Sequence, residues 1–151
     1  MKRLASAFAM FCLMAMVVCM FSTKAHAGDY LGEYCWRFTN PPSGNTGTLK
    51  IGITSIGGGH FLCSGISTVD NYPENIWPPD GIFSVYGNAE LVGNRIVITL
   101  SNAGARDGVI GNDMSVITLD PQTLNGTGKG IGVYSDKIEH SEYTATFIGC
   151  Q

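Results

Sequence analysis

The chain has 151 residues, of which nine are basic and twelve are acidic, so its net charge at pH 7 is −3. The basic residues form no run or stripe, which argues against nucleic acid or an anionic membrane surface as a partner. Glycine is frequent and charged residues are few, at 20 residues and 14%, a composition typical of many short strands joined by turns.

The amino end has the pattern of a secretory signal peptide. Lys2 and Arg3 supply a positive start, Leu4–Phe21 is apolar, and Ala25-His26-Ala27 places small residues at a cleavage site. We therefore predict that residues 1–27 are a cleaved signal peptide and that the protein is secreted or periplasmic.

Two alternatives remain for this leader. It could stay as an anchor, because its apolar run is at the lower limit of a membrane-spanning helix, or Cys19 could carry a lipid. After cleavage, residues 28–151 form one predicted domain with six basic and twelve acidic residues, a net charge of −6, and no further membrane span.

Eight strands are predicted in the mature chain, because runs of β-branched and aromatic residues alternate with Gly, Pro, Asn and Asp breaks. The predicted strands are Tyr34–Thr39, Gly47–Thr54, His60–Ser67, Ile82–Leu91, Arg95–Leu100, Met114–Leu119, Leu124–Tyr134 and Glu142–Cys150. Gly57-Gly58-Gly59 predicts a turn with positive φ, and Gly93-Asn94 a two-residue hairpin turn of type II′.

The remaining connections are predicted as loops. Thr68–Gly81 is too long for a simple hairpin, Ser101–Asp113 is rich in Gly and Asp, and Ser135–Ser141 reads as a polar turn that contains His140. No helical period follows Ala27.

Alternation of apolar and polar residues gives each strand an inner and an outer face. Tyr34, Trp36 and Phe38 share one face of the first strand, opposite Cys35 and Arg37. An outer-membrane barrel would show the reverse polarity, apolar outside and polar inside. The pattern predicts an all-β protein, an eight-stranded antiparallel up-and-down β-barrel with an apolar interior.

The cysteines test this barrel. Cys35 and Cys150 have outward parity in the first and last strands, which are antiparallel neighbours in a closed barrel, so we predict a disulfide between them. Cys63 is left as a buried free thiol. No metal-ligand spacing is present, and we predict no metal and no cofactor.

The opening segment Tyr30-Leu31-Gly32-Glu33-Tyr34-Cys35-Trp36 resembles the first strand of calycins, the group of lipocalin-like and avidin-like barrels. The segment Leu119–Thr127 is similar to late hairpins in uncharacterised small secreted bacterial barrels. The resemblance implies the barrel fold. It does not imply a ligand.

The interior is the predicted ligand site. An eight-stranded barrel is either filled by side chains or holds one small ligand, and both interpretations stay open. Trp77, in the long connection, is predicted to cover the barrel mouth or to fill its end. The predicted ligand-binding residues are aromatic: Tyr34, Trp36, Phe38, Phe61, Trp77, Phe83, Tyr143 and Phe147.

Two other groups of residues are not predicted to form sites. The oxygen-bearing side chains of Asp107, Asn112 and Asp113, and those of Asp70, Glu74 and Asp80, do not have EF-hand spacing and are predicted to be solvated. His60 and His140 lie in no recognisable catalytic motif.

From these observations we expect no enzyme. The predicted function is non-catalytic binding of a small apolar or amphipathic ligand by a secreted or periplasmic barrel. The alternative is a structural or protein-interaction module of the envelope, inhibitor-like, with a filled barrel. The pattern does not indicate an oligomeric state.

Overall fold

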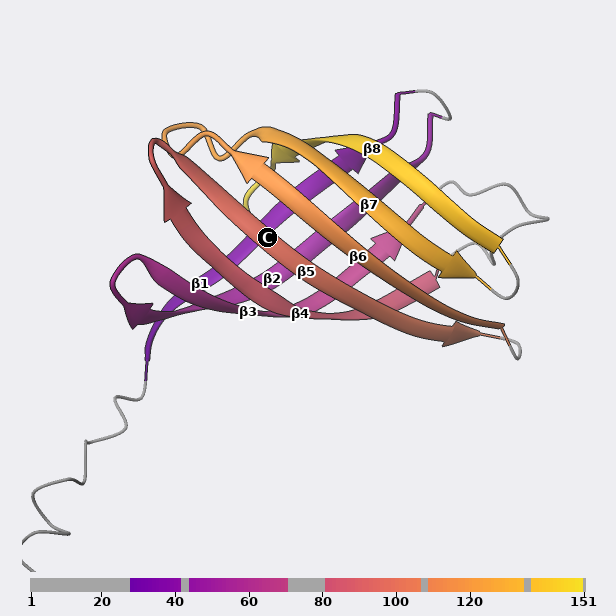
Figure 1. Ribbon diagram of the computed structural model, residues 1–151, viewed down its shortest axis with the longest axis horizontal. Coiled ribbons are helices and arrows are strands. Elements are labelled where there is room, and N and C mark those ends of the chain that lie inside the picture. The colour runs from indigo at the N-terminus through magenta and orange to yellow at the C-terminus, as the bar shows by residue number, and fades with distance from the viewer. Residues whose placement is uncertain (1–27, 42–43, 71–80, 107–108, 135–136, 151) are drawn as a thin grey trace, which may run out of the picture.

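The computed structural model describes residues 28–41, 44–70, 81–106, 109–134 and 137–150 (Figure 1). Within these residues, eight antiparallel strands follow one another around a closed barrel in chain order. This confirms the predicted fold class. The strands are β1 Asp29–Thr39, β2 Thr46–Gly57, β3 His60–Val69, β4 Gly81–Val92, β5 Arg95–Arg106, β6 Val109–Leu119, β7 Gly126–Tyr134 and β8 Lys137–Phe147.

The predicted turns at one end of the barrel are present. Gly57, Gly58 and Gly59 all have positive φ, at 89°, 64° and 79°, a region that is open to glycine at low cost. Gly93 has φ 60° where β4 turns into β5. These two short turns lie at the end of the barrel that holds the carboxyl terminus, which we call the closed end.

Two predicted loops are wrong. The stretch Ser101–Asp113 is mostly strand, because β5 continues to Arg106 and β6 begins at Val109. His140 lies on β8 opposite Ile131 and not in a turn. In both places polar residues occupy strand positions, so composition favoured a loop where the backbone pairing is regular.

The barrel closes through a short pairing of β1 with β8, in which Trp36–Thr39 lie opposite Thr144–Phe147. β8 ends at Phe147, earlier than predicted. Beyond it, the Ile148 amide donates a hydrogen bond to the Cys35 carbonyl at 3.0 Å. This extends the pairing toward the carboxyl end.

The disulfide joins Cys35 and Cys150, as predicted, with a Cα–Cα distance of 5.1 Å. It therefore covalently links the two strands that close the barrel. Cys63 is the free cysteine among the described residues and is buried, and burial raises the pKa of its thiol to about 11.

The hydrophobic core lies inside the barrel and is densest toward the closed end. Its largest fully buried side chains, each at most about 2% exposed, belong to inward positions of four strands, β1, β2, β5 and β6: Trp36, Leu49, Ile51, Ile98, Leu100, Ile117 and Leu119. Tyr34, Phe61 and Phe147 pack against this core. The parity predicted for the strands is thus confirmed.

Trp36 connects this core to the loop between β6 and β7. Its indole Nε1 donates a hydrogen bond to the carbonyl of Leu124 at 2.8 Å, and Leu124 has φ 57°, the left-handed region that non-glycine residues rarely adopt. Trp36 also lies in an aromatic cluster with Tyr34 and Phe147, at ring-centroid distances of 6.1 and 5.8 Å. Trp36 therefore packs in the core and also stabilises the strained loop through its hydrogen bond to Leu124.

No helix among the described residues is long and apolar enough to cross a membrane.

Removing the disulfide should destabilise the barrel strongly. The bond spans 115 residues, and a closed loop of that size reduces the entropy of the unfolded chain by an amount worth about 4–5 kcal/mol. We expect the double variant Cys35→Ala/Cys150→Ala and the reduced wild type to lose similar free energy of unfolding in urea. In native protein at pH 8, Cys63 should resist alkylation. Peptide mapping that found Cys63 in a bridge would contradict this assignment.

Trp36→Phe should keep the fold and lower its stability. The variant retains an aromatic ring but leaves the Leu124 carbonyl without its indole donor, a loss of about 1–3 kcal/mol. Urea unfolding followed by circular dichroism measures it. If the variant is as stable as wild type, the indole hydrogen bond does not stabilise the strained loop.

Candidate functional site

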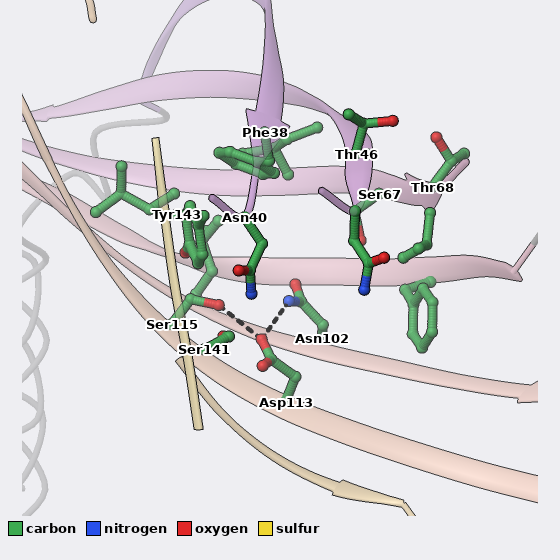
Figure 2. Close-up of a pocket in the computed structure, with 17 residues that line it drawn as sticks. Phe38, Asn40, Thr46, Ser67, Thr68, Asn102, Asp113, Ser115, Ser141 and Tyr143 are labelled. Atoms are coloured by element: carbon green, nitrogen blue, oxygen red, sulfur yellow. Dashed lines mark hydrogen bonds between the residues drawn. The ribbon is translucent and has the colours of Figure 1, made fainter. Parts of the chain in front are cut away.

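A pocket of about 160 Å³ opens at the end of the barrel opposite the closed end. We call this the open end. It is where β1 runs into β2, β3 into β4, β5 into β6 and β7 into β8, and Figure 2 shows the pocket between these strands. The barrel is therefore filled by side chains at one end and contains a cavity at the other.

One wall of the pocket is apolar. Phe38 from β1, Phe83 from β4 and Leu100 from β5 line it, together with Leu49 and Ile117 from the core. The ring of Phe38 lies 4.7 Å, centroid to centroid, from the ring of Tyr143 on β8. These side chains extend the hydrophobic core toward the open end, where they line the cavity.

A polar wall is organised by Asp113 on β6 and lies nearer the open end of β5 and β6 than Leu100 and Ile117 do. Asp113 Oδ1 accepts a hydrogen bond from Asn102 Nδ2 at 2.7 Å and another from Ser115 Oγ at 2.6 Å (Figure 2). Asn102 lies on β5 directly opposite Asp113. The three side chains form a network that faces the interior of the barrel.

A buried acceptor in this network has no partner. Asn102 Oδ1 is buried and accepts no hydrogen bond within the described structure. Its orientation is fixed by its own amide nitrogen, because exchanging the two atoms would put an oxygen 2.7 Å from the Asp113 carboxylate oxygen. A buried unpaired acceptor costs about 1–3 kcal/mol, so its presence needs an explanation.

Glycine on β7 makes room for the polar wall. A Cβ atom on Gly130 would lie 3.0 Å from Asp113 Oδ2 and 2.9 Å from Ser141 Oγ. At Gly128, a Cβ atom would collide with the ring of Tyr143. The tyrosine ring therefore lies flat against a strand that carries no side chain at that point, and it borders the pocket.

Burial sets the electrostatics of the site. It raises the pKa of the Asp113 carboxyl above its ordinary value, although the hydrogen bonds from Ser115 and Asn102 act in the opposite direction. Burial also raises the pKa of Tyr143 to about 12, with a smaller contribution from the charge of Asp113. Tyr143 therefore keeps its proton at neutral pH, and among the described residues that line the pocket Asp113 is the one with a carboxyl group.

Three of the predicted ligand-binding residues line the pocket: Phe38, Phe83 and Tyr143. Tyr34, Trp36, Phe61 and Phe147 instead belong to the packed core or its edge. Trp77 lies outside the described residues. The sequence analysis thus selected aromatic residues from the whole length of the barrel, whereas the cavity occupies only its open end.

Sequence reasoning missed Asn102, Asp113 and Ser115. A signal for them existed, because Ile96, Ile98 and Leu100 continue with period two to Asn102, and Leu119 and Ile117 continue backward to Ser115 and Asp113. Placing Ser101–Asp113 in a loop hid the inward parity of Asn102 and Asp113, and the prediction that Asp113 is solvated is wrong, because it lines the pocket. Ser115 lay in the predicted strand Met114–Leu119 but was not recognised as an inward site residue.

The other candidate clusters do not form sites. Asn112 is exposed on β6 while its neighbour Asp113 points inward, so they do not share a ligand. Asp107, Glu74 and Asp80 lie outside the described residues. No group of three or more His, Cys, Asp or Glu side chains that could hold a metal occurs in the described part of the chain. His60 lies beside Glu90 at 3.7 Å on the outer surface.

No protein-family model, curated protein or solved structure matches this chain. Its function must therefore be inferred from the pocket itself.

Asp113 should make stability depend on pH with a definite sign. Because its pKa is raised in the folded state, the folded protein binds this proton more tightly than the unfolded chain does. Its contribution to the free energy of unfolding should therefore increase as the pH falls from 7.5 toward the unfolded pKa of about 3.9.

Asp113→Asn removes this contribution and serves as the comparison. Urea unfolding of both proteins at pH 7.5 and pH 4.5 should show the variant gaining on wild type at the higher pH. Tyr143, whose charge state is coupled to Asp113, stays protonated over this range. An unchanged difference between the two proteins at both pH values would contradict the assignment.

Proposed function

We propose that this protein binds a small amphipathic ligand in the open end of its barrel and that it does so without catalysing a reaction. The observation that carries the proposal is the pocket of about 160 Å³ with one apolar and one polar wall. Its volume is close to that of a protein cavity of about 150 Å³ that takes up benzene. A ligand with a body of one small ring or a short chain fits this size.

The architecture supports binding because the two halves of the interior have separate roles. The closed half contains Trp36 and the aliphatic core, which supplies stability. The open half leaves space where Gly130 and Ser115 replace larger side chains. A pocket on a rigid barrel keeps its shape without a ligand, which lowers the entropic cost of binding.

We also propose that the protein acts outside the cytoplasm. The Cys35–Cys150 disulfide supports this proposal, because such bonds persist in oxidising compartments. The signal peptide and its cleavage after Ala27 remain predictions, as does the resemblance to the calycin group.

The alternative function, a structural or protein-interaction envelope module, requires a filled barrel. The closed half meets that requirement. Apolar side chains are also exposed on the outer faces of β6, β7 and β8, where Met114 is paired with Ile131 and Val133 with Ile138. The hollow open end favours ligand binding over this alternative.

Blocking the pocket should abolish binding. Ser67 lies on the inner face of β3 between Leu49 and Phe83 and lines the pocket, so Ser67→Phe should fill it. Ser64 lies on the same strand with its side chain outside and exposed, so Ser64→Phe is the matched control.

The measurement is native mass spectrometry of protein purified from its own host without reduction. We expect a bound mass that disappears on denaturation in wild type and Ser64→Phe and that is absent from Ser67→Phe. A wild-type protein that carries no ligand and gains no stability from any compound in a fragment screen would favour the filled-barrel alternative. Circular dichroism verifies that both variants fold.

A further inference from the structure

The polar wall presents the carboxylate of Asp113, and with it a negative charge, to the pocket. Asn102 Oδ1 is buried without a donor, and its neighbour Asp113 is a carboxylate whose Oδ1 already accepts two hydrogen bonds. Figure 2 shows the Asn102 amide nitrogen directed toward Asp113 and its oxygen directed away from that carboxylate. A ligand that satisfies this wall must therefore donate.

The charge of the lining selects among donors. Among the described residues that line the pocket, Asp113 is charged, and none is Lys, Arg or His. A carboxylate ligand would meet a carboxylate without a basic partner. A neutral hydroxyl could donate one hydrogen bond, whereas a primary ammonium group donates three and carries the compensating charge.

The apolar wall indicates that the part of the ligand away from its ammonium group is apolar. Phe38 and Phe83 flank the cavity, and Leu100 lies beside Asn102 along β5. An aromatic ring or short alkyl chain attached to the ammonium group would contact these side chains while its head reaches Asp113. The volume of about 160 Å³ limits the buried part to about the size of one ring.

We propose that the open end of the barrel is a binding site for a small primary amine in its protonated form, with the ammonium group held by the Asp113 carboxylate and the apolar body against Phe38 and Phe83. This proposal rests on the proposed function, since it names the ligand class of the same pocket. It departs from the expectation that the ligand is mainly apolar, because the aromatic residues found from the sequence form only one wall. The raised pKa of Asp113 fits the same arrangement, because a bound cation would favour the ionised carboxylate that burial disfavours.

The test compares three ligands of the same size on the wild-type protein. Benzylamine is protonated at neutral pH, benzyl alcohol is neutral, and benzoate is negatively charged. The protein is expressed with its own leader and purified without reduction, and the dissociation constants are measured by isothermal titration calorimetry at pH 7.5. We expect benzylamine to bind at least about tenfold more tightly than either analogue, in line with a charge-assisted hydrogen bond.

Two variants locate the cation. Asp113→Asn keeps the shape of the side chain and removes its charge. Glu142→Gln removes one negative charge from the outer face of β8, where Glu142 is exposed beside Lys129. We expect Asp113→Asn to weaken benzylamine at least about tenfold and to leave benzyl alcohol within about threefold. Glu142→Gln should bind all three ligands as wild type does.

Each other outcome overturns a definite part of the proposal. Benzyl alcohol or benzoate binding as tightly as benzylamine would overturn the amine assignment and leave the proposed ligand pocket in place. Benzylamine binding that both variants weaken equally, or that neither weakens, would place the cation on the acidic surface and overturn the site. Absence of binding by all three ligands would overturn the amine site together with the ligand pocket.

Discussion

The structure depends on how its barrel is closed. Every other pair of neighbouring strands is joined over at least nine paired positions, whereas β1 and β8 meet over only Trp36–Thr39 and Thr144–Phe147. A strand edge with unpaired amides is a weak point in a sheet. The Cys35–Cys150 disulfide and the Ile148 amide extend the contact at the closed end, and Trp36 links the same position to the β6–β7 loop. Closure is therefore secured at the end where the core is filled.

Because these stabilising interactions lie at the closed end, the fold depends less on packing at the open end. The aromatic cluster of Trp36, Tyr34 and Phe147 lies at the site of closure, where Trp36 pairs with Phe147, and it packs against the aliphatic core. Toward the open end the inner positions of β5 and β6 become polar, because Asn102 follows Ile98 and Leu100 on β5 and Asp113 and Ser115 precede Ile117 and Leu119 on β6. A barrel of eight strands has just enough interior for side chains or one small ligand. In this barrel, side chains fill the interior at the closed end and leave a pocket at the open end.

Much of this was predictable from the sequence, for a physical reason that also explains the failures. A strand places alternate residues on opposite faces, so apolar alternation located the strands, their inner faces and the shared parity of Cys35 and Cys150. The same rule could not find strands whose inner positions are polar. Asn102 and Asp113 look like loop residues because a buried polar pair is rare, and only the pairing of β5 with β6 reveals that each satisfies the other. A pocket forms where side chains are absent, which alternation does not reveal. The sequence therefore does not show that Gly130 makes room for Asp113 and Ser141, because this requires knowing that they lie beside it.

The polar wall is the part of the interior that folding alone does not account for. An apolar pair in place of Asn102 and Asp113 would continue the core, and burying a polar group without a partner costs free energy. Asp113 accepts hydrogen bonds from two donors, yet burial still raises its pKa. Its ionised form therefore lowers the free energy of unfolding. Asn102 donates from its amide nitrogen to Asp113, which leaves its own Oδ1 buried without a hydrogen-bond donor. A titratable group whose pKa is perturbed inside a pocket is a candidate functional group, and a cationic donor would favour the ionised form of Asp113 that burial disfavours. The stability supplied by the closed end is what allows such a wall to persist.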